Sequence, residues 1–108
     1  MPIHLLSEIE DPRLTYYRNL PDKSLKKEGL FVAEGLIVIR RLLKSKLSCV
    51  SVLCSEAQVE GLKDLVGEID LHVVPKNLIS QIVGYDFHRG ALALAQIPCM
   101  DLSNAQIS

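Results

Sequence analysis

Four short apolar runs alternate along this chain with segments in which apolar residues recur every three or four positions. The runs are typical of buried strands and span residues 30–33, 49–54, 71–74 and 90–97. This alternation predicts an α/β fold, a three-layer α/β/α sandwich with a largely parallel sheet that helices cover on both faces. A chain of 108 residues has room for one such core. With 48% hydrophobic residues it has enough apolar surface to fold.

Start and stop residues mark the predicted helices. Asp11 and Pro12 open the first, which we expect to run to about Leu20, because Asp caps free N–H groups and Pro fits the first helical position. Ser55 with Gln58 three residues later is a capping-box pattern that starts the third helix. The fourth begins near Pro75 and stops at Gly84.

The second predicted helix, residues 36–46, is amphipathic. Its apolar face is expected to contain Leu36, Ile39, Leu42, Leu43 and Leu47. Three basic residues, Arg40, Arg41 and Lys44, share another arc of the same helix. The helix is therefore expected to pack on the sheet with a positively charged outer surface.

The cysteines favour a reducing compartment. There are three, at positions 49, 54 and 99, with no C-x-x-C spacing, so neither a disulfide framework nor a metal site is predicted. Cys49 and Cys54 lie an odd number of residues apart in one strand, so we expect them to face opposite sides of the sheet. All three are interpreted as small buried hydrophobic residues.

Several function classes find no support in the sequence. It has no phosphate-binding glycine loop, no dinucleotide-binding turn and no nucleophile elbow. The three histidines are scattered, and His72 is expected to be a half-buried strand residue. No catalytic residue, cofactor site or metal site is therefore predicted. No apolar run approaches the ~20 residues of a membrane span, and the first residues do not form a signal peptide, so we expect a cytoplasmic protein.

Charge is unevenly distributed, although the formal net charge is −1. Residues 1–46 contain nine Lys and Arg against six Asp and Glu, whereas residues 47–108 contain three against seven. This asymmetry points to an anionic partner, and it is equally compatible with an ordinary solvated surface.

Two segments combine charge with aromatic residues. The first places Tyr16 and Tyr17 among the basic residues Arg13, Arg18, Lys23, Lys26, Lys27, Arg40, Arg41 and Lys44. Such side chains neutralise phosphates and stack on unpaired bases, but they also occur on ordinary helix surfaces with a tyrosine packed inward. The second is the loop 84–90, G-Y-D-F-H-R-G, which is either a site or a tight loop with Phe87 in the core.

These segments resemble the N-terminal substrate-binding domain of the SpoU (TrmH-like) RNA ribose methyltransferases. The matching words are D-P-R-L at 11–14, Y-R-N-L-P-D at 17–22, G-L-F-V-A-E-G at 29–35, V-I-R-R at 38–41 and G-Y-D-F-H-R-G-A-L-A at 84–93. They occur in the family's order and cover about residues 9–98. The family's first motif often begins with Asn, where this chain has Asp11.

The resemblance implies a small α/β/α sandwich without a knot, similar to ribosomal and kink-turn RNA binders, that helps to hold tRNA or rRNA. It implies an RNA-binding domain over residues 1–97 and a linker over 98–108. In this family a knotted domain follows, binds S-adenosylmethionine, forms a homodimer and methylates a ribose 2′-hydroxyl. The motifs of that domain do not occur here, so the chain alone is expected to be non-catalytic and to hold no cofactor.

The resemblance and the basic pattern together assign roles to individual residues. Phosphate contacts are expected from Arg13, Arg18, Lys23, Lys26, Lys27, Arg40, Arg41, Lys44 and Arg89. Tyr16 and His88 are expected to stack on bases or to contact hydroxyl groups. The alternative is a non-enzymatic module that associates with its own kind through the acidic second half and the loop around Phe87.

Overall fold

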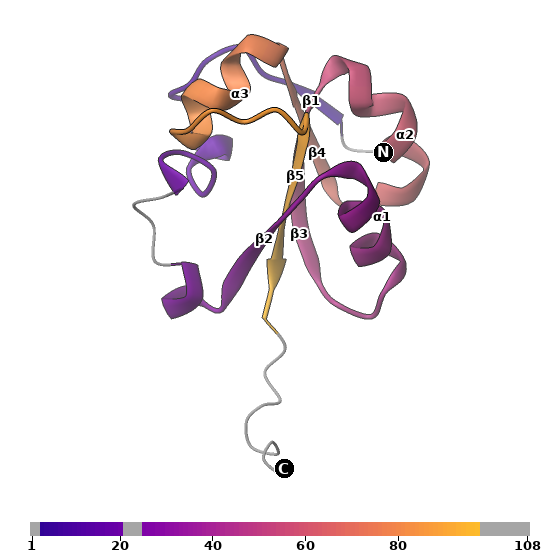
Figure 1. The fold of residues 1–108 in the computed structure, drawn as a ribbon. Coiled ribbons are helices and arrows are strands. Elements are labelled where there is room, and N and C mark those ends of the chain that lie inside the picture. Colours follow the sequence, from indigo (N-terminus) through magenta and orange to yellow (C-terminus); the bar gives the residue numbers. More distant parts are fainter. Residues whose placement is uncertain (1–2, 21–24, 98–108) are drawn as a thin grey trace.

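One mixed sheet forms the centre of the molecule. Our computed structural model describes residues 3–20 and 25–97, and in these ranges five strands pair in the order β1-β4-β3-β5-β2 (Figure 1). The strands are β1 (Ile3–Leu5), β2 (Leu30–Glu34), β3 (Cys49–Ser55), β4 (Asp70–Val74) and β5 (Ala91–Gln96). β4 is parallel to both β1 and β3, whereas β5 is antiparallel to both β3 and β2.

Helices cover both faces of this sheet. The described residues contain α1 (Leu36–Lys44), α2 (Val59–Val66), α3 (Lys76–Val83) and the short 3-10 turns η1 (Pro12–Leu14), η3 (Leu25–Glu28) and η4 (Glu56–Gln58). α1 and α2 lie on one side of the sheet and α3 on the other (Figure 1). The predicted α/β class is thus confirmed, but the sheet is mixed and not largely parallel as predicted, because β5 runs antiparallel to both of its neighbours. None of the helices in the described part of the chain is long and apolar enough to span a membrane.

The alternation of residues along β5 separates two apolar cores. Leu92 and Leu94 face the core that contains η1 and α3, whereas the alanines at 91, 93 and 95 face the core that contains α1 and α2. All five residues are at most 1% exposed. Because alanine side chains are short, α1 and α2 can pack close to the sheet on that face.

The predicted helix over residues 11–20 is wrong. Only the turn η1 forms there, followed by further turns, and Asn19 adopts a left-handed conformation with φ of 53°. The Asn19 N–H donates to the carbonyl of Ile82 in α3, so the backbone bonds to another element instead of continuing a helix. The predicted cap is correct, because the Asp11 carboxylate accepts from the Arg13 N–H at 2.9 Å.

Two details of the other helices also differ from prediction. Ser55 makes no side-chain cap hydrogen bond, and the residues after it form the 3-10 turn η4 before α2 begins. α1 ends at Lys44, because the next residue, Ser45, is extended and its N–H and hydroxyl both donate to the carbonyl of Leu42. Leu47 therefore lies beyond the helix, with 38% of its surface exposed. Ile39 and Leu42 supply the fully buried part of the expected apolar face.

Cys49 and Cys54 pack against the same core, contrary to the prediction that they face opposite sides. The register of β3 against β5 shifts between Cys49 and Ser51, so Val50 is an extra residue that reverses the alternation. Burial raises the pKa of the Cys49 thiol to about 11 and that of Cys54 to about 12. Cys99 lies outside the described residues.

Candidate nucleic-acid interface

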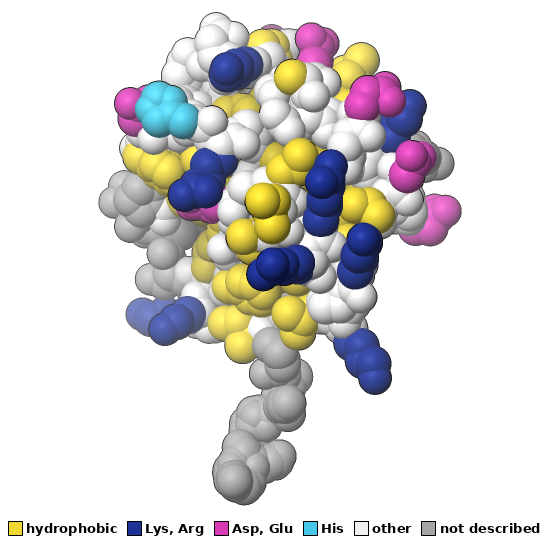
Figure 2. Space-filling view, turned by 45° about the vertical axis from the view of Figure 1, so that its right-hand side comes forward, with side chains coloured by type: hydrophobic (Ala, Val, Ile, Leu, Met, Phe, Trp, Pro, Cys, Tyr) yellow, Lys and Arg dark blue, Asp and Glu magenta, His cyan; other side chains and the backbone are white. Residues whose placement is uncertain are grey.

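The exposed side of α1 carries a continuous basic and apolar surface. With about 100° between successive helical residues, the outward arc runs through Arg40, Lys44, Ile37, Arg41 and Val38 in that order. All five are exposed, and α1 contains no acidic residue. Figure 2 shows Lys and Arg side chains interspersed with hydrophobic ones on this face. We call this arc the α1 surface.

The cations of the α1 surface are not neutralised locally. Within residues 3–20 and 25–97, neither arginine of α1 nor Lys44 makes an ion pair. Arg41 and Lys44 lie in the last turn, where the carbonyl end of the helix favours positive charge. These side chains can therefore approach an anion without first leaving a carboxylate partner.

Arg40 also contributes to packing between α1 and α2. A Cβ atom built on Gly61 of α2 would lie 3.2 Å from Nη2 of Arg40 and 3.5 Å from a methyl carbon of Leu36. The absence of a side chain at Gly61 lets the guanidinium lie across α2. Its position is therefore partly fixed before any ligand arrives.

The loop 84–90 is packed, not open. Phe87 is 8% exposed, and its N–H donates to the Ser80 hydroxyl at 2.9 Å while that hydroxyl contacts the Phe87 carbonyl at 3.2 Å. The Tyr85 hydroxyl donates to Oε2 of Glu34 at 2.6 Å, and burial together with this carboxylate raises the pKa of Tyr85. Phe87 thus belongs to the core, and the loop exposes His88 and Arg89 to solvent.

Arg89 extends the α1 surface. Its Nη1 atom lies 3.5 Å from the position of a Cβ atom on Gly35, the residue before α1. Arg89 also lines a hollow of about 260 Å³ with Glu34, Leu36, Ile37 and Val38. His88 instead pairs with Asp86 at 3.2 Å, and both side chains are more than 80% exposed.

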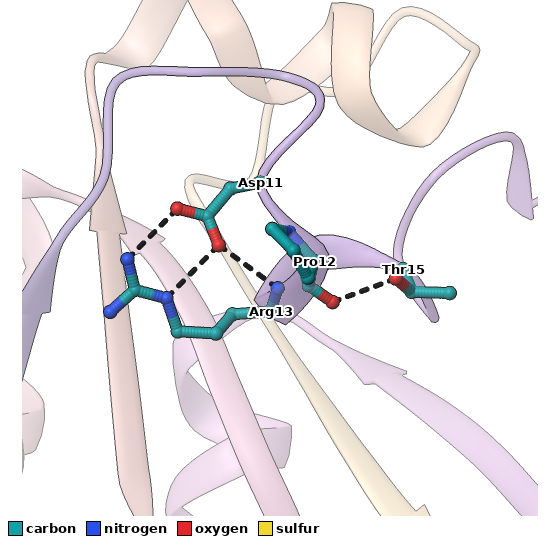
Figure 3. Close-up of polar contacts among 4 residues, drawn as sticks. All are labelled: Asp11, Pro12, Arg13 and Thr15. Carbon is teal, nitrogen blue, oxygen red and sulfur yellow. Dashed lines mark hydrogen bonds and ion pairs between the residues drawn. The ribbon is translucent and has the colours of Figure 1, made fainter.

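Arg13 and Arg18 are balanced by neighbouring carboxylates. Arg13 donates from Nε at 3.0 Å and from Nη2 at 2.9 Å to the two oxygens of Asp11 (Figure 3). These hydrogen bonds lower the pKa of Asp11 to about 2, so the carboxylate stays charged at neutral pH. Arg18 pairs with Glu10 at 3.0 Å.

The remaining predicted residues lie apart from the α1 surface. The Tyr16 hydroxyl donates to Glu28 at the end of η3, and Lys26 and Lys27 lie in that same turn. Leu25 packs η3 against the core on the opposite face of the sheet from α1. Lys23 lies outside the described residues.

The structure therefore gathers Arg40, Arg41, Lys44 and Arg89 and separates them from the other predicted contacts. The sequence interpretation overlooked Ile37 and Val38, which are 67% and 49% exposed within the same arc. A helical projection contains that signal for Ile37, which falls between Lys44 and Arg41, whereas Val38 falls between Arg41 and the buried Leu42, so its exposure is seen only in the structure.

Two solved structures that superpose on this chain are RNA methyltransferases. An rRNA methyltransferase from Sinorhizobium meliloti superposes with a TM-score of 0.72 over 91% of this chain, at 19% identity, and the match covers 38% of that protein. An RNA 2′-O ribose methyltransferase matches over 92% of this chain with a TM-score of 0.64 and 19% identity, covering 40% of its own chain. At this identity the likeness establishes the fold alone, as one part of larger proteins.

Curated relatives carry the same kind of name. A protein of Mycobacterium bovis named as an uncharacterized tRNA/rRNA methyltransferase is 27% identical over 95 residues, which is 81% of this chain. Its Mycobacterium tuberculosis counterpart is 28% identical over 94 residues. The chain spans about a third of the length of these relatives, and no family model matches it. The resemblance to RNA methyltransferases that the motifs indicated is confirmed.

Proposed function

We propose that this chain is the substrate-RNA-binding domain of an S-adenosylmethionine-dependent tRNA or rRNA 2′-O-ribose methyltransferase. The observation that carries the proposal is the α1 surface with Arg89, four cations without an ion pair among the described residues. RNA is the polyanion that the named relatives suggest. Its phosphates would displace counterions as they meet these side chains.

In the proposed function, this chain binds RNA and carries out no chemical step. Residues 1–97 form the RNA-binding domain, a three-layer sandwich of the kind found in kink-turn RNA binders. We propose that residues 98–108 are a linker; they lie outside the described residues. In this proposal, methyl transfer, a knotted fold and homodimer formation are functions of the part of the enzyme outside this chain, and the enzyme is cytoplasmic.

S-adenosylmethionine does not fit the described residues well. In α/β sheets, ligands usually bind beyond the carboxyl ends of the strands. At the carboxyl end of β3, the Ser55 N–H donates to the carbonyl of Gly90, and a Cβ on Gly90 would lie 3.1 Å from Nε2 of Gln58. Backbone and side chain thus fill the carboxyl end of β3, and we propose that the cofactor is held elsewhere in the complete enzyme.

A second candidate function is self-association of a non-enzymatic module. Ile37 and Val38 favour it, because two exposed aliphatic residues side by side are a common element of protein interfaces. Analytical ultracentrifugation of the chain over a range of concentrations distinguishes the two functions. A mass that rises with concentration, combined with no affinity for RNA, supports self-association.

The direct test of RNA binding is the double change Arg40→Glu and Arg41→Glu. Both side chains are exposed, so the fold should persist, and circular dichroism checks that loss of the Arg40 contact with α2 does not unfold the helices. We expect the affinity for structured tRNA or rRNA to fall at least about tenfold. The slope of log K against log salt should become less steep by about two, one for each phosphate contact removed.

The matched control reverses two charges elsewhere. Lys63→Glu with Lys76→Glu makes the same change in net charge on α2 and α3. This control should retain most of the affinity. Equal loss in both variants would mean that net charge alone governs binding, and no binding by the unmodified chain at low salt would refute the proposed function.

A further inference from the structure

A second hollow opens at the other end of β3 from Arg89. It has a volume of about 360 Å³ and lies where β3 and β4 begin, lined among others by His4, Arg13, Tyr16, Ser51, His72 and Leu94. This volume is within the range of ~300–1,000 Å³ of small-ligand sites. Nothing in the proposed function uses this hollow.

His72 lines the hollow with a largely buried imidazole ring. The residue is 4% exposed, and its Nδ1 atom has no hydrogen-bond partner among the described residues. Burial, and then the neighbouring His4, lower the pKa of His72, so the ring is neutral at neutral pH. A neutral imidazole has one donor and one acceptor nitrogen, which suits a ligand edge that also combines donors and acceptors.

Planar side chains surround the hollow, and carboxylates hold three of them, namely His4, Tyr16 and Arg13. His4 bonds to Asp70 at 2.9 Å and lies 5.3 Å from His72 between ring centroids. The Tyr16 hydroxyl donates to a carboxylate at 3.1 Å, and its ring is 40% exposed. Arg13 is held by its two bonds to Asp11 (Figure 3). Groups fixed in this way lose little further freedom when they stack on a ligand.

The charges around the hollow favour an uncharged ligand. The Arg13 guanidinium is balanced by Asp11, the carboxylate of Asp70 adds negative charge, and His72 is neutral. A phosphate group would find no unpaired cation here among the described residues. A flat, polar, uncharged ring meets both the stacking surfaces and the imidazole.

We infer that this hollow accepts one unpaired nucleobase, stacked on Tyr16 and hydrogen-bonded at its edge to His72. Unpaired bases in RNA are commonly recognised by stacking on aromatic or guanidinium planes with hydrogen bonds to their edges. That the base comes from an RNA strand rests on the proposed function. The same chemistry would also hold the base of a free nucleotide.

Side-chain NMR of the full 108-residue chain separates the base from the phosphate. The four ribonucleoside 5′-monophosphates are titrated in parallel with ribose 5-phosphate, and the imidazole signals of His4 and His72 are followed. We expect at least one mononucleotide to shift both histidines and ribose 5-phosphate to leave them unchanged. An equal response to ribose 5-phosphate would overturn the inference, because it would indicate an anion site.

Single-stranded oligoribonucleotides then test the source of the base. Tyr16→Ala should weaken their binding about tenfold, within the range measured for loss of one stacking contact. Tyr16→Phe, which keeps the ring, should retain most of the affinity, and the neighbouring exposed Thr15→Ala serves as a control for the turn.

The outcomes distinguish this inference from the proposed function. RNA that shifts signals of α1 but not those of the histidines overturns the nucleobase site and leaves the proposed function intact. Mononucleotides that shift the histidines, without any binding of RNA, support the nucleobase site as a free-nucleotide site and count against the proposed function. Equal affinity of Tyr16→Ala and Tyr16→Phe for the oligoribonucleotides would also overturn the inference.

Discussion

Burial of His72 should make stability depend on pH. The folded chain holds this imidazole at a lowered pKa, whereas the unfolded chain has the ordinary value near 6.5. As the pH falls below about 6.5, the unfolded chain binds the proton first, so the free energy of unfolding decreases. Urea denaturation from about pH 7.5 to about pH 5.5 measures the effect.

Two variants assign this pH dependence. His72→Gln should flatten the decrease, whereas His88→Gln should not, because His88 is exposed. The titratable and charged groups near His72 are His4, Asp70, Arg13 and Asp11. An unchanged pH profile in His72→Gln would show that His72 is not the source of the dependence.

Gly35 should tolerate substitution poorly. Its φ of 96° and ψ of 146° lie in a region that residues with a side chain rarely adopt, so Gly35→Ala should lower the free energy of unfolding by about 1–3 kcal/mol. The control Gly61→Ala lies within α2 and meets only flexible side-chain ends, so a change below about 1 kcal/mol is expected. Similar losses in the two variants would argue against backbone strain at Gly35.

For individual residues, the sequence shows which side chains carry charge but not which side chains they pair with. It predicted the basic residues of α1 and their shared arc, because helical periodicity determines that arrangement. It did not reveal that Glu10 balances Arg18, because this pair depends on the turns that replace the predicted first helix. The hollow at His72 was also missed, since it requires β1, which places His4 beside His72.

Within α1, the buried and exposed faces should respond differently to truncation. Ile39 is fully buried, so Ile39→Ala should lower the free energy of unfolding by about 2–5 kcal/mol. Ile37 is 67% exposed, so Ile37→Ala should change it by less than about 0.5 kcal/mol. Chemical denaturation of both variants checks this, and a large loss in Ile37→Ala would show that this residue is not free on the surface.

Most elements were predictable because each carries its own periodic pattern. β1 was missed, since three residues are too few to show a period. The direction of β5 was also not visible. The loop after α3 returns the chain to the carboxyl end of β3, where the Ser55 N–H donates to the carbonyl of Gly90. β5 therefore starts from that end and runs antiparallel.

Across the whole molecule, RNA binding should depend strongly on salt. If Arg40, Arg41, Lys44 and Arg89 each meet one phosphate, raising NaCl from about 50 to about 200 mM should weaken binding by roughly 50- to 150-fold. Fluorescence anisotropy with labelled RNA at several salt concentrations measures this slope. A slope near zero would exclude phosphate contacts as the source of affinity.

The position of β5 determines when this chain can fold during synthesis. β5 is the last described strand, yet it lies between β3 and β2, and β2 pairs with no other strand in the described residues. A nascent polypeptide must therefore keep residues 30–34 unpaired until Gln96 has left the ribosome. Translation that stalls near Gly90 would leave β3 with an unpaired edge and residues 30–34 without a partner strand, and such exposed edges are targets for chaperones and proteases.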